Sequence, residues 1–160
     1  MSRTAAMESL QAAGFADRVI VLEENTATVQ LAAQALGVEP GRIAKTLSFL
    51  VRDRAVMVVA EGTARIDNGK FKQAFGAKAK MIPPEQVEAL TGHAPGGVCP
   101  FGRREGVPVY LDVSLRRFDP VYPAAGDDHT AVRLALSELE AAMRPVGWVD
   151  VAKEAPPTEA

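Results

Sequence analysis

Lys45 is the residue whose type and setting point most directly to chemistry. It lies in the apolar segment 43–50, and in an extended strand its side chain shares one face with those of Ile43 and Leu47. Two interpretations stay open. The ammonium group can reach past the apolar face to water, or it can project into the mouth of a pocket and bind a phosphate or another anion.

The segment 91–106 is a second candidate, because it holds five glycines and two prolines in 16 residues. Glycine lets a loop turn its backbone N–H groups toward one point, where they can hold a carbonyl oxygen or an oxyanion. Pro95 and Pro100 would stiffen such a loop. The alternative is a surface crossover that needs glycine only for its tight turns. The segment contains no nucleotide-binding glycine motif.

Histidine and cysteine are weaker candidates. His129 follows two aspartates beside a turn, where it can act as a base, donate a hydrogen bond or lie in solvent, and His93 is equally open. Nothing close to Cys99 in the sequence favours its thiolate, so a packed thiol is the better interpretation. The spacing shows no nucleophile–base–acid triad. One cysteine and two histidines exclude an internal disulfide and argue against a metal site, and we expect no cofactor.

Basic residues gather in the segment 65–80, which has five lysines and arginines against one aspartate. An ordinary solvated face explains such a cluster, and so does a patch that follows the phosphates of an RNA end. Aromatic RNA-binding motifs do not accompany it. On the second interpretation the RNA-binding residues are Lys70, Lys72, Lys78, Lys80 and Arg103.

These candidates need elements to position them. Helical spacing and glycine stops predict helices over 3–13, 26–36 and 66–75, and residues 83–85, with proline in the first turn, predict a further helix. Apolar and β-branched runs predict strands at 18–22, 43–51, 55–60, 80–82, 107–112, 121–124, 130–134 and 148–151. The polar connection 52–54 predicts a hairpin. Ser137 and Glu140 predict a capping box that opens a last helix. The mixture predicts one α+β domain with a mixed, largely antiparallel sheet or partial barrel flanked by helices.

Composition sets the remaining limits. The chain has 160 residues, of which 48% are apolar and 24% charged, and this excludes intrinsic disorder and a fibrous protein. A net charge of −2 argues against a nucleic-acid binder that is basic throughout. Residues 1–10 lack the apolar core that is typical of a signal peptide, and the sequence has no apolar run of about 18 residues, so we expect a cytoplasmic protein without membrane contact. We expect one domain over 1–153 and a frayed tail over 154–160.

Several segments together resemble one known family. They are Thr26-Ala27, 32–38, 43–47, 58–62, 91–93, 109–112 and Ala125-Gly126. The strongest is 96–102, Gly-Gly-Val-Cys-Pro-Phe-Gly, which resembles a family loop of the form Gly-x-x-x-Pro. In order and spacing these segments are similar to the YbaK/prolyl-tRNA synthetase editing-domain family, over about residues 15–151.

The resemblance implies a freestanding aminoacyl-tRNA deacylase. Such a hydrolase cleaves the ester of a mischarged amino acid on tRNA, often tRNA(Pro), and so serves translation fidelity. In that family the lysine matching Lys45 is important for activity and lies near the terminal adenosine, where it can meet a phosphate. The matching loop offers backbone donors to the substrate carbonyl; its residues here are Gly96, Gly97, Val98, Cys99 and Pro100. Water attacks with help from the substrate's own vicinal ribose hydroxyl, so no protein base is required.

The resemblance also implies a substrate-binding set, namely Thr46, Leu47, His129, Val29 and Ala60. Thr46 resembles the branch that acts on cysteinyl-tRNA(Pro), whereas some alanine-editing members carry asparagine there. Cys, Ala and Ser all stay open as the amino acid removed. The expected partners are aminoacyl-tRNA, chiefly tRNA(Pro), and prolyl-tRNA synthetase.

Two competing hypotheses remain. The same fold can serve as a non-catalytic tRNA- or synthetase-binding module, which the basic segment 65–80 favours and the retained lysine and loop oppose. A small-molecule enzyme that uses the thiol of Cys99 is the other.

Overall fold

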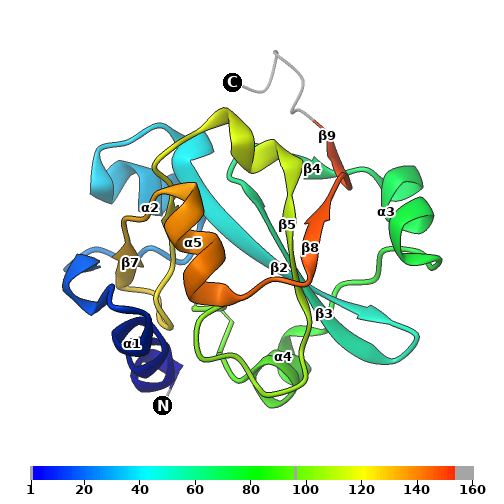
Figure 1. Ribbon diagram of the computed structural model, residues 1–160, viewed down its shortest axis with the longest axis horizontal. Helices are drawn as coiled ribbons and strands as arrows, with labels where there is room; N and C mark the ends of the chain where they lie inside the picture. Colours follow the sequence, from blue (N-terminus) through cyan, green and yellow to red (C-terminus); the bar gives the residue numbers. More distant parts are fainter. Residues whose placement is uncertain (1, 96, 154–160) are drawn as a thin grey trace.

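The computed structural model describes residues 2–95 and 97–153 (Figure 1). This part of the chain forms the α-helices α1 (Ser2–Ala13), α2 (Val29–Leu36), α3 (Asn68–Phe75), α4 (Pro84–Thr91) and α5 (Leu136–Met143). Its 3-10 helices are η1 (Ala16–Arg18), η2 (Pro40–Arg42) and η3 (Val113–Arg117). Its strands are β1 (Val19–Val21), β2 (Ile43–Val51), β3 (Arg54–Glu61), β4 (Arg65–Ile66), β5 (Val109–Asp112), β6 (Tyr122–Pro123), β7 (Thr130–Val132), β8 (Gly147–Val149) and β9 (Ala152–Lys153). The expected tail, 154–160, lies outside the described residues.

A mixed five-stranded sheet in the order β6-β2-β3-β5-β8 forms the centre of the molecule. The long pairing of β2 with β3 is antiparallel, whereas the other neighbours pair in parallel over short stretches. β1 and β7 form an antiparallel ribbon, which the bridges Val121–Leu134 and Ala124–Ala131 join to the β6 side. β4 and β9 form a second short ribbon. The predicted α+β domain with a mixed sheet flanked by helices is confirmed, although three of the four pairings within the central sheet are parallel, so this sheet is less antiparallel than expected.

The β2–β3 hairpin is also confirmed, and its turn explains its register. Val51 pairs with Arg54, so only Arg52 and Asp53 connect the strands. Both residues have positive φ, 50° and 66°, which is the conformation of a type I′ turn whose twist matches the flanking strands. The tight turn fixes which side chains of β2 share a face.

Both faces of the hairpin are covered. Met57 and Val59 point into a core that also holds buried side chains of α1, α5 and β5. On the other face Phe49 packs against Phe71 of α3, with 4.7 Å between the ring centroids. Figure 1 shows α1 and α5 on one side of the hairpin and α3 on the other. Among the described residues, no helix has the length and apolarity needed to cross a membrane.

Two helices begin later than the sequence predicts, because a side chain caps each of them. Thr28 is extended and caps α2, so this helix begins at Val29 instead of at Thr26. The carboxylate of Asp67 accepts the Lys70 N–H at 3.0 Å and caps α3.

The capping box predicted at Ser137 and Glu140 is wrong. Helix α5 begins at Leu136, and it is Glu138 that accepts the N–H of Ala135 at 2.9 Å. Ala135 precedes the helix and has no side-chain oxygen, so the first N–H of the helix, that of Leu136, donates instead to the Asp119 carboxylate at 3.1 Å.

Strand β2 is left partly open along one edge. β6 covers only its first two residues, and the strand predicted at 80–82 is reduced to one bridge between Met81 and Phe49. Between these two covers, no strand of the described chain pairs with residues 45–47 on this edge. An edge with unpaired backbone groups is a place where another molecule can bind.

Candidate functional site at the open edge of β2

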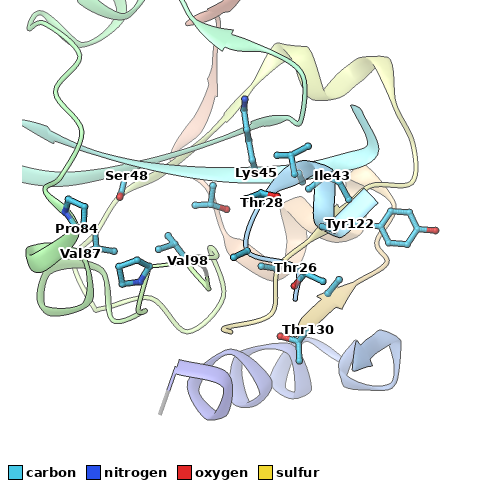
Figure 2. A pocket seen from close by; sticks show the side chains of 18 of the residues that line it. Thr26, Thr28, Ile43, Lys45, Ser48, Pro84, Val87, Val98, Tyr122 and Thr130 are labelled. Carbon is cyan, nitrogen blue, oxygen red and sulfur yellow. The ribbon is translucent and has the colours of Figure 1, made fainter. Parts of the chain in front are cut away.

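A pocket of about 280 Å³ lies along the open edge of β2 (Figure 2). Its walls come from segments that are far apart in the sequence: the start of α2, β2 itself, the segment leading into α4, the glycine-rich loop and the β6–β7 region. Most of the lining is apolar, with hydroxyl groups of threonine, serine and tyrosine spread through it. No carboxylate lines the pocket within the described chain, and Lys45 is its one cation there. These walls suit a small organic group of modest polarity.

Backbone groups of β2 contribute to the pocket as well. Just beyond it, the Leu50 N–H donates to the Lys80 carbonyl at 2.8 Å, and the Ser48 carbonyl accepts the Ile82 N–H at 3.1 Å. Backbone groups alternate in direction along an antiparallel strand, so the N–H and C=O of Thr46 point to the same edge. No strand of the described chain pairs with Thr46 on this edge, and these two groups are available to a ligand.

Lys45 lines the pocket, but its side chain runs along the opposite side of β2 from that of Ser48 (Figure 2). Its ammonium group donates a hydrogen bond to the carbonyl of Ala64. Burial lowers the pKa of Lys45, while the nearby Glu61 carboxylate raises it and Arg65 lowers it further. Lys45 is therefore a half-buried cation whose hydrogen-bond acceptor is a neutral carbonyl. An anion that entered would form a stronger hydrogen bond with the ammonium than this carbonyl does.

The glycine-rich loop reaches the same pocket through Pro95 and Val98. Gly97 packs so closely on the turn after β6 that a Cβ would lie 2.6 Å from the Cα of Asp127 and 2.7 Å from the carbonyl oxygen of Gly126. Its N–H donates to the Ala94 carbonyl at 3.0 Å, so this amide is used within the loop. Gly96, the first residue of the predicted donor set, lies outside the described residues.

Within the loop, Cys99 and Pro100 are buried and do not line the pocket. Burial raises the pKa of the Cys99 thiol to about 12, and its Sγ lies 3.4 Å from the carbonyl oxygen of Phe101. The same carbonyl is 2.7 Å from Nε2 of His93, a residue with no solvent exposure. A thiol in this setting is inert at neutral pH, which counts against the hypothesis of a thiol enzyme.

The substrate-binding set predicted from the sequence divides into two groups. Thr46 and Val29 line the pocket beside Lys45. Leu47 packs in the core on the Phe49 side of the sheet, and Ala60 is fully buried. His129 is half-buried at the turn before β7, where its Nδ1 lies 2.7 Å from a carboxylate oxygen of Asp128. The structure therefore does not place these last three in the lining.

The predicted RNA-binding residues are spread over the surface. Lys70 on α3 pairs with Asp150 at 3.1 Å, and Lys72 and Lys78 are exposed. Lys80 is exposed next to Met81, which lines the pocket.

Arg103 is placed differently from the lysines. Its guanidinium donates to the carbonyls of Val107, Pro100 and Met143 at 2.7, 2.9 and 2.8 Å. Burial lowers its pKa. These three bonds tie the loop to α5 and use most of its donors within the protein.

Part of the pocket wall has no counterpart in the sequence-based predictions. Ser48 lies two residues after Thr46 on β2, so strand alternation places both on one face, and that spacing could have identified it. Ile82 and Val87 also line the pocket. They carry no chemical signal in the sequence, because only the path of the chain along β2 brings them there.

Comparisons with known proteins point to the same family as the sequence segments that show the resemblance. A family model for the "Aminoacyl-tRNA editing domain" matches residues 23–142. The Bacillus subtilis (strain 168) protein "Uncharacterized protein YwhH" is 47% identical over 137 residues, 85% of this chain and 87% of that one. In Enterococcus faecalis (strain ATCC 700802 / V583), "Putative Cys-tRNA(Pro)/Cys-tRNA(Cys) deacylase EbsC" is 31% identical over 114 residues, 70% of each chain.

One solved structure has a similar fold over almost the full length of both chains. The chain described as "Crystal structure of a putative trans-editing enzyme for prolyl tRNA synthetase" matches with a TM-score of 0.84 at 33% identity. The match covers 95% of this chain and 97% of that one.

Proposed function

The chain belongs to the aminoacyl-tRNA editing-domain family, and we propose that it hydrolyses, in trans, the ester between tRNA(Pro) and a wrongly attached small amino acid: Cys, Ala or Ser. The observation that carries this proposal is the pocket, where Lys45 and Val98 contribute to the walls of one small cavity. The names of two similar proteins, one for Cys-tRNA deacylation and one for trans-editing, support it.

Lys45 would hold the anionic end of the substrate. Its ammonium now donates to the Ala64 carbonyl and would exchange this partner for a phosphate oxygen of the terminal nucleotide. A phosphate at this position offsets the burial that lowers the pKa of Lys45. The bound anion therefore keeps the ammonium protonated, and the ammonium holds the ester at the pocket entrance.

The ester carbonyl would face the glycine-rich loop. Gly97 uses its own N–H within the loop, so the N–H of Val98, the next loop residue in the pocket lining, would be the donor for the carbonyl oxygen. Water adds to the carbonyl carbon with help from the vicinal ribose hydroxyl, and the bond to the ribose oxygen breaks. Free amino acid and uncharged tRNA leave. An aminoacyl ester is already activated, so positioning and oxyanion stabilisation are sufficient.

Pocket size would select the amino acid. A missing methylene changes binding by only about 1–3 kcal/mol, so binding alone separates similar small side chains poorly. Exclusion of larger side chains by the walls at Ile82, Val87 and Val98 is the sharper filter.

The test is a panel of tRNA(Pro) charged separately with Cys, Ala, Ser and Pro, incubated with and without the protein. We expect at least one of the three small amino acids to be released at a rate proportional to protein concentration, while prolyl-tRNA(Pro) stays intact. Release of none of them would overturn the proposal. A salt-dependent affinity for tRNA(Pro) without any release would identify a binding module instead.

A further inference from the structure

Ser48 presents a hydroxyl group inside the pocket that nothing in the described part of the protein satisfies. The residue is only 6% exposed, and Figure 2 shows its side chain pointing into the pocket at the end formed by Pro84, Val87 and Val98. Within the described chain its hydroxyl makes no hydrogen bond. Its own carbonyl is held by the Ile82 N–H at 3.1 Å, so the backbone that aims the side chain is fixed.

Two other pocket residues have hydroxyl oxygens without a partner in the described chain, but they differ from Ser48. The oxygens of Thr26 and Thr46 are sealed from solvent. The Ser48 oxygen is not sealed, so a molecule in the pocket can reach it. Ser48 is thus the hydroxyl at this end of the pocket that a ligand can contact directly.

The surroundings of Ser48 decide what kind of group would bind there. Its neighbours in the wall, Met81, Ile82, Pro84 and Val87, present apolar side chains. A ligand group that fills this end expels the water that can otherwise solvate the hydroxyl. A methyl group then leaves the hydroxyl unpaired, which costs free energy, whereas a hydroxyl group replaces the lost water.

We infer that Ser48 is a specificity-determining residue, whose hydroxyl hydrogen-bonds a hydroxyl group on the side chain of the amino acid to be removed. This rests on the proposed function and narrows its substrate class, because it predicts that the pocket prefers a seryl ester to an alanyl ester. The same asymmetry operates wherever a site is built to hydrogen-bond a substrate hydroxyl: the analogue that lacks the hydroxyl is disfavoured.

The test compares kcat/KM for Ser-tRNA(Pro) and Ala-tRNA(Pro) in the wild type and in Ser48→Ala. We expect the wild type to prefer the seryl ester, and the ratio of seryl to alanyl kcat/KM to fall by about tenfold in Ser48→Ala, in line with the loss of one hydrogen bond. Ser114→Ala is the matched control. Ser114 is also a buried serine, but its hydroxyl accepts the Glu61 N–H at 3.2 Å, away from the pocket lining. It should leave the ratio unchanged.

The outcomes separate this inference from the proposed function. If the wild type releases neither amino acid nor Cys, the proposed function fails. If it releases both but shows no preference for the seryl ester, or if Ser48→Ala keeps the wild-type ratio, only the role of Ser48 is overturned. The wild-type comparison needs no variant, so the inference stays testable even if Ser48→Ala does not fold.

Discussion

Lys45 is a half-buried lysine on β2 that lines the pocket while its side chain runs along the opposite side of the strand from Ser48 (Figure 2). Burial lowers its pKa, and the Glu61 carboxylate opposes this effect. Glu61 is itself only 1% exposed and accepts a hydrogen bond from the Thr63 hydroxyl at 2.6 Å. The Glu61 carboxylate therefore favours the charged form of Lys45, and the ammonium, which uses one of its three donors on the Ala64 carbonyl, keeps donors for a ligand.

Replacing Lys45 by alanine should lower kcat/KM for mischarged tRNA(Pro) by roughly 10- to 100-fold, because a hydrogen bond to a charged group contributes about 1.5–3 kcal/mol. Steady-state deacylation kinetics measure this. Lys153→Ala is the control, since Lys153 is an exposed lysine on β9 outside the pocket lining, and it should behave like the wild type. Full activity in Lys45→Ala would remove this residue from the mechanism.

The burial of His93 predicts how the free energy of unfolding depends on pH. Burial lowers its pKa, and the hydrogen bond to Phe101 only partly offsets this. The unfolded chain then takes up a proton near the ordinary pKa of about 6.5 before the folded chain does. The stability contributed by neutral His93 is complete above that pH and is lost as the pH falls through and below it.

Urea unfolding of the wild type at about pH 7 and about pH 5 should therefore show a loss of free energy of unfolding at the lower pH. His93→Gln has no titrating group at this position and should show a smaller loss over the same interval. Equal losses in the two proteins would show that His93 does not cause the pH dependence.

At the scale of elements, the site depends on the loop being held against the turn after β6. Gly97 allows this contact because a Cβ there would lie 2.6 Å from the Asp127 Cα, and backbone atoms cannot easily move out of the way. The loop position, and with it the position of Val98 in the pocket wall, thus follows from the absence of a side chain at one residue.

Gly97→Ala should push the loop away from the 126–127 turn and lower kcat/KM for the ester by at least about tenfold, because small displacements in a catalytic site are costly. Deacylation rates and thermal melting measure the effect. Gly147→Ala is the matched control, because nothing lies within 4 Å of a Cβ added there. If both variants retain wild-type rates, the close approach at Gly97 does not position the site.

The elements also show what the sequence can predict. The β2–β3 hairpin was predictable because two apolar runs flank a short polar turn, and Lys45 stood out because its charge interrupts an apolar face. The pocket wall at Met81 and Ile82 was not predictable from the sequence. Its position depends on how far β6 extends along β2 and on where the chain after β3 returns to form a bridge with β2. The local pattern of apolar and polar residues determines which side chains share a face of a strand, whereas the path of the whole chain determines which edge of the sheet stays unpaired.

At the scale of the whole molecule, the net charge of −2 means that the proposed tRNA binding would have to use local basic surface. Lys78 and Lys80 are exposed, and Lys80 precedes Met81 in the pocket wall. If the 3′ end of a tRNA enters the pocket as we propose, these two lysines would meet phosphates of that strand. When lysines neutralise the phosphates of a tRNA, the tRNA releases counterions, so the affinity of the protein for tRNA would fall as the salt concentration rises.

The double variant Lys78→Ala/Lys80→Ala should bind tRNA(Pro) more weakly and show a shallower dependence of log K on log salt. The slope should fall by roughly 0.7 for each phosphate of a single strand that these lysines neutralise in the wild type. Hydrolysis of a minimal aminoacyl-adenosine ester should stay unchanged, because that substrate lacks the strand. Fluorescence anisotropy over a salt series measures the slope. A slope equal to that of the wild type would place the tRNA on another face.

The central claim is that the acyl group of the substrate binds in the pocket while Lys45 binds its phosphate. The most direct test is a crystal structure of the protein with an inert substrate analogue. A suitable analogue is 5′-phosphorylated adenosine with the amino acid joined to the 3′ position through an amide. We expect the acyl group in the pocket against Val98 and the phosphate within hydrogen-bond reach, about 3 Å, of the Lys45 ammonium. An acyl group outside this pocket, or a phosphate remote from Lys45, would contradict the proposed mechanism.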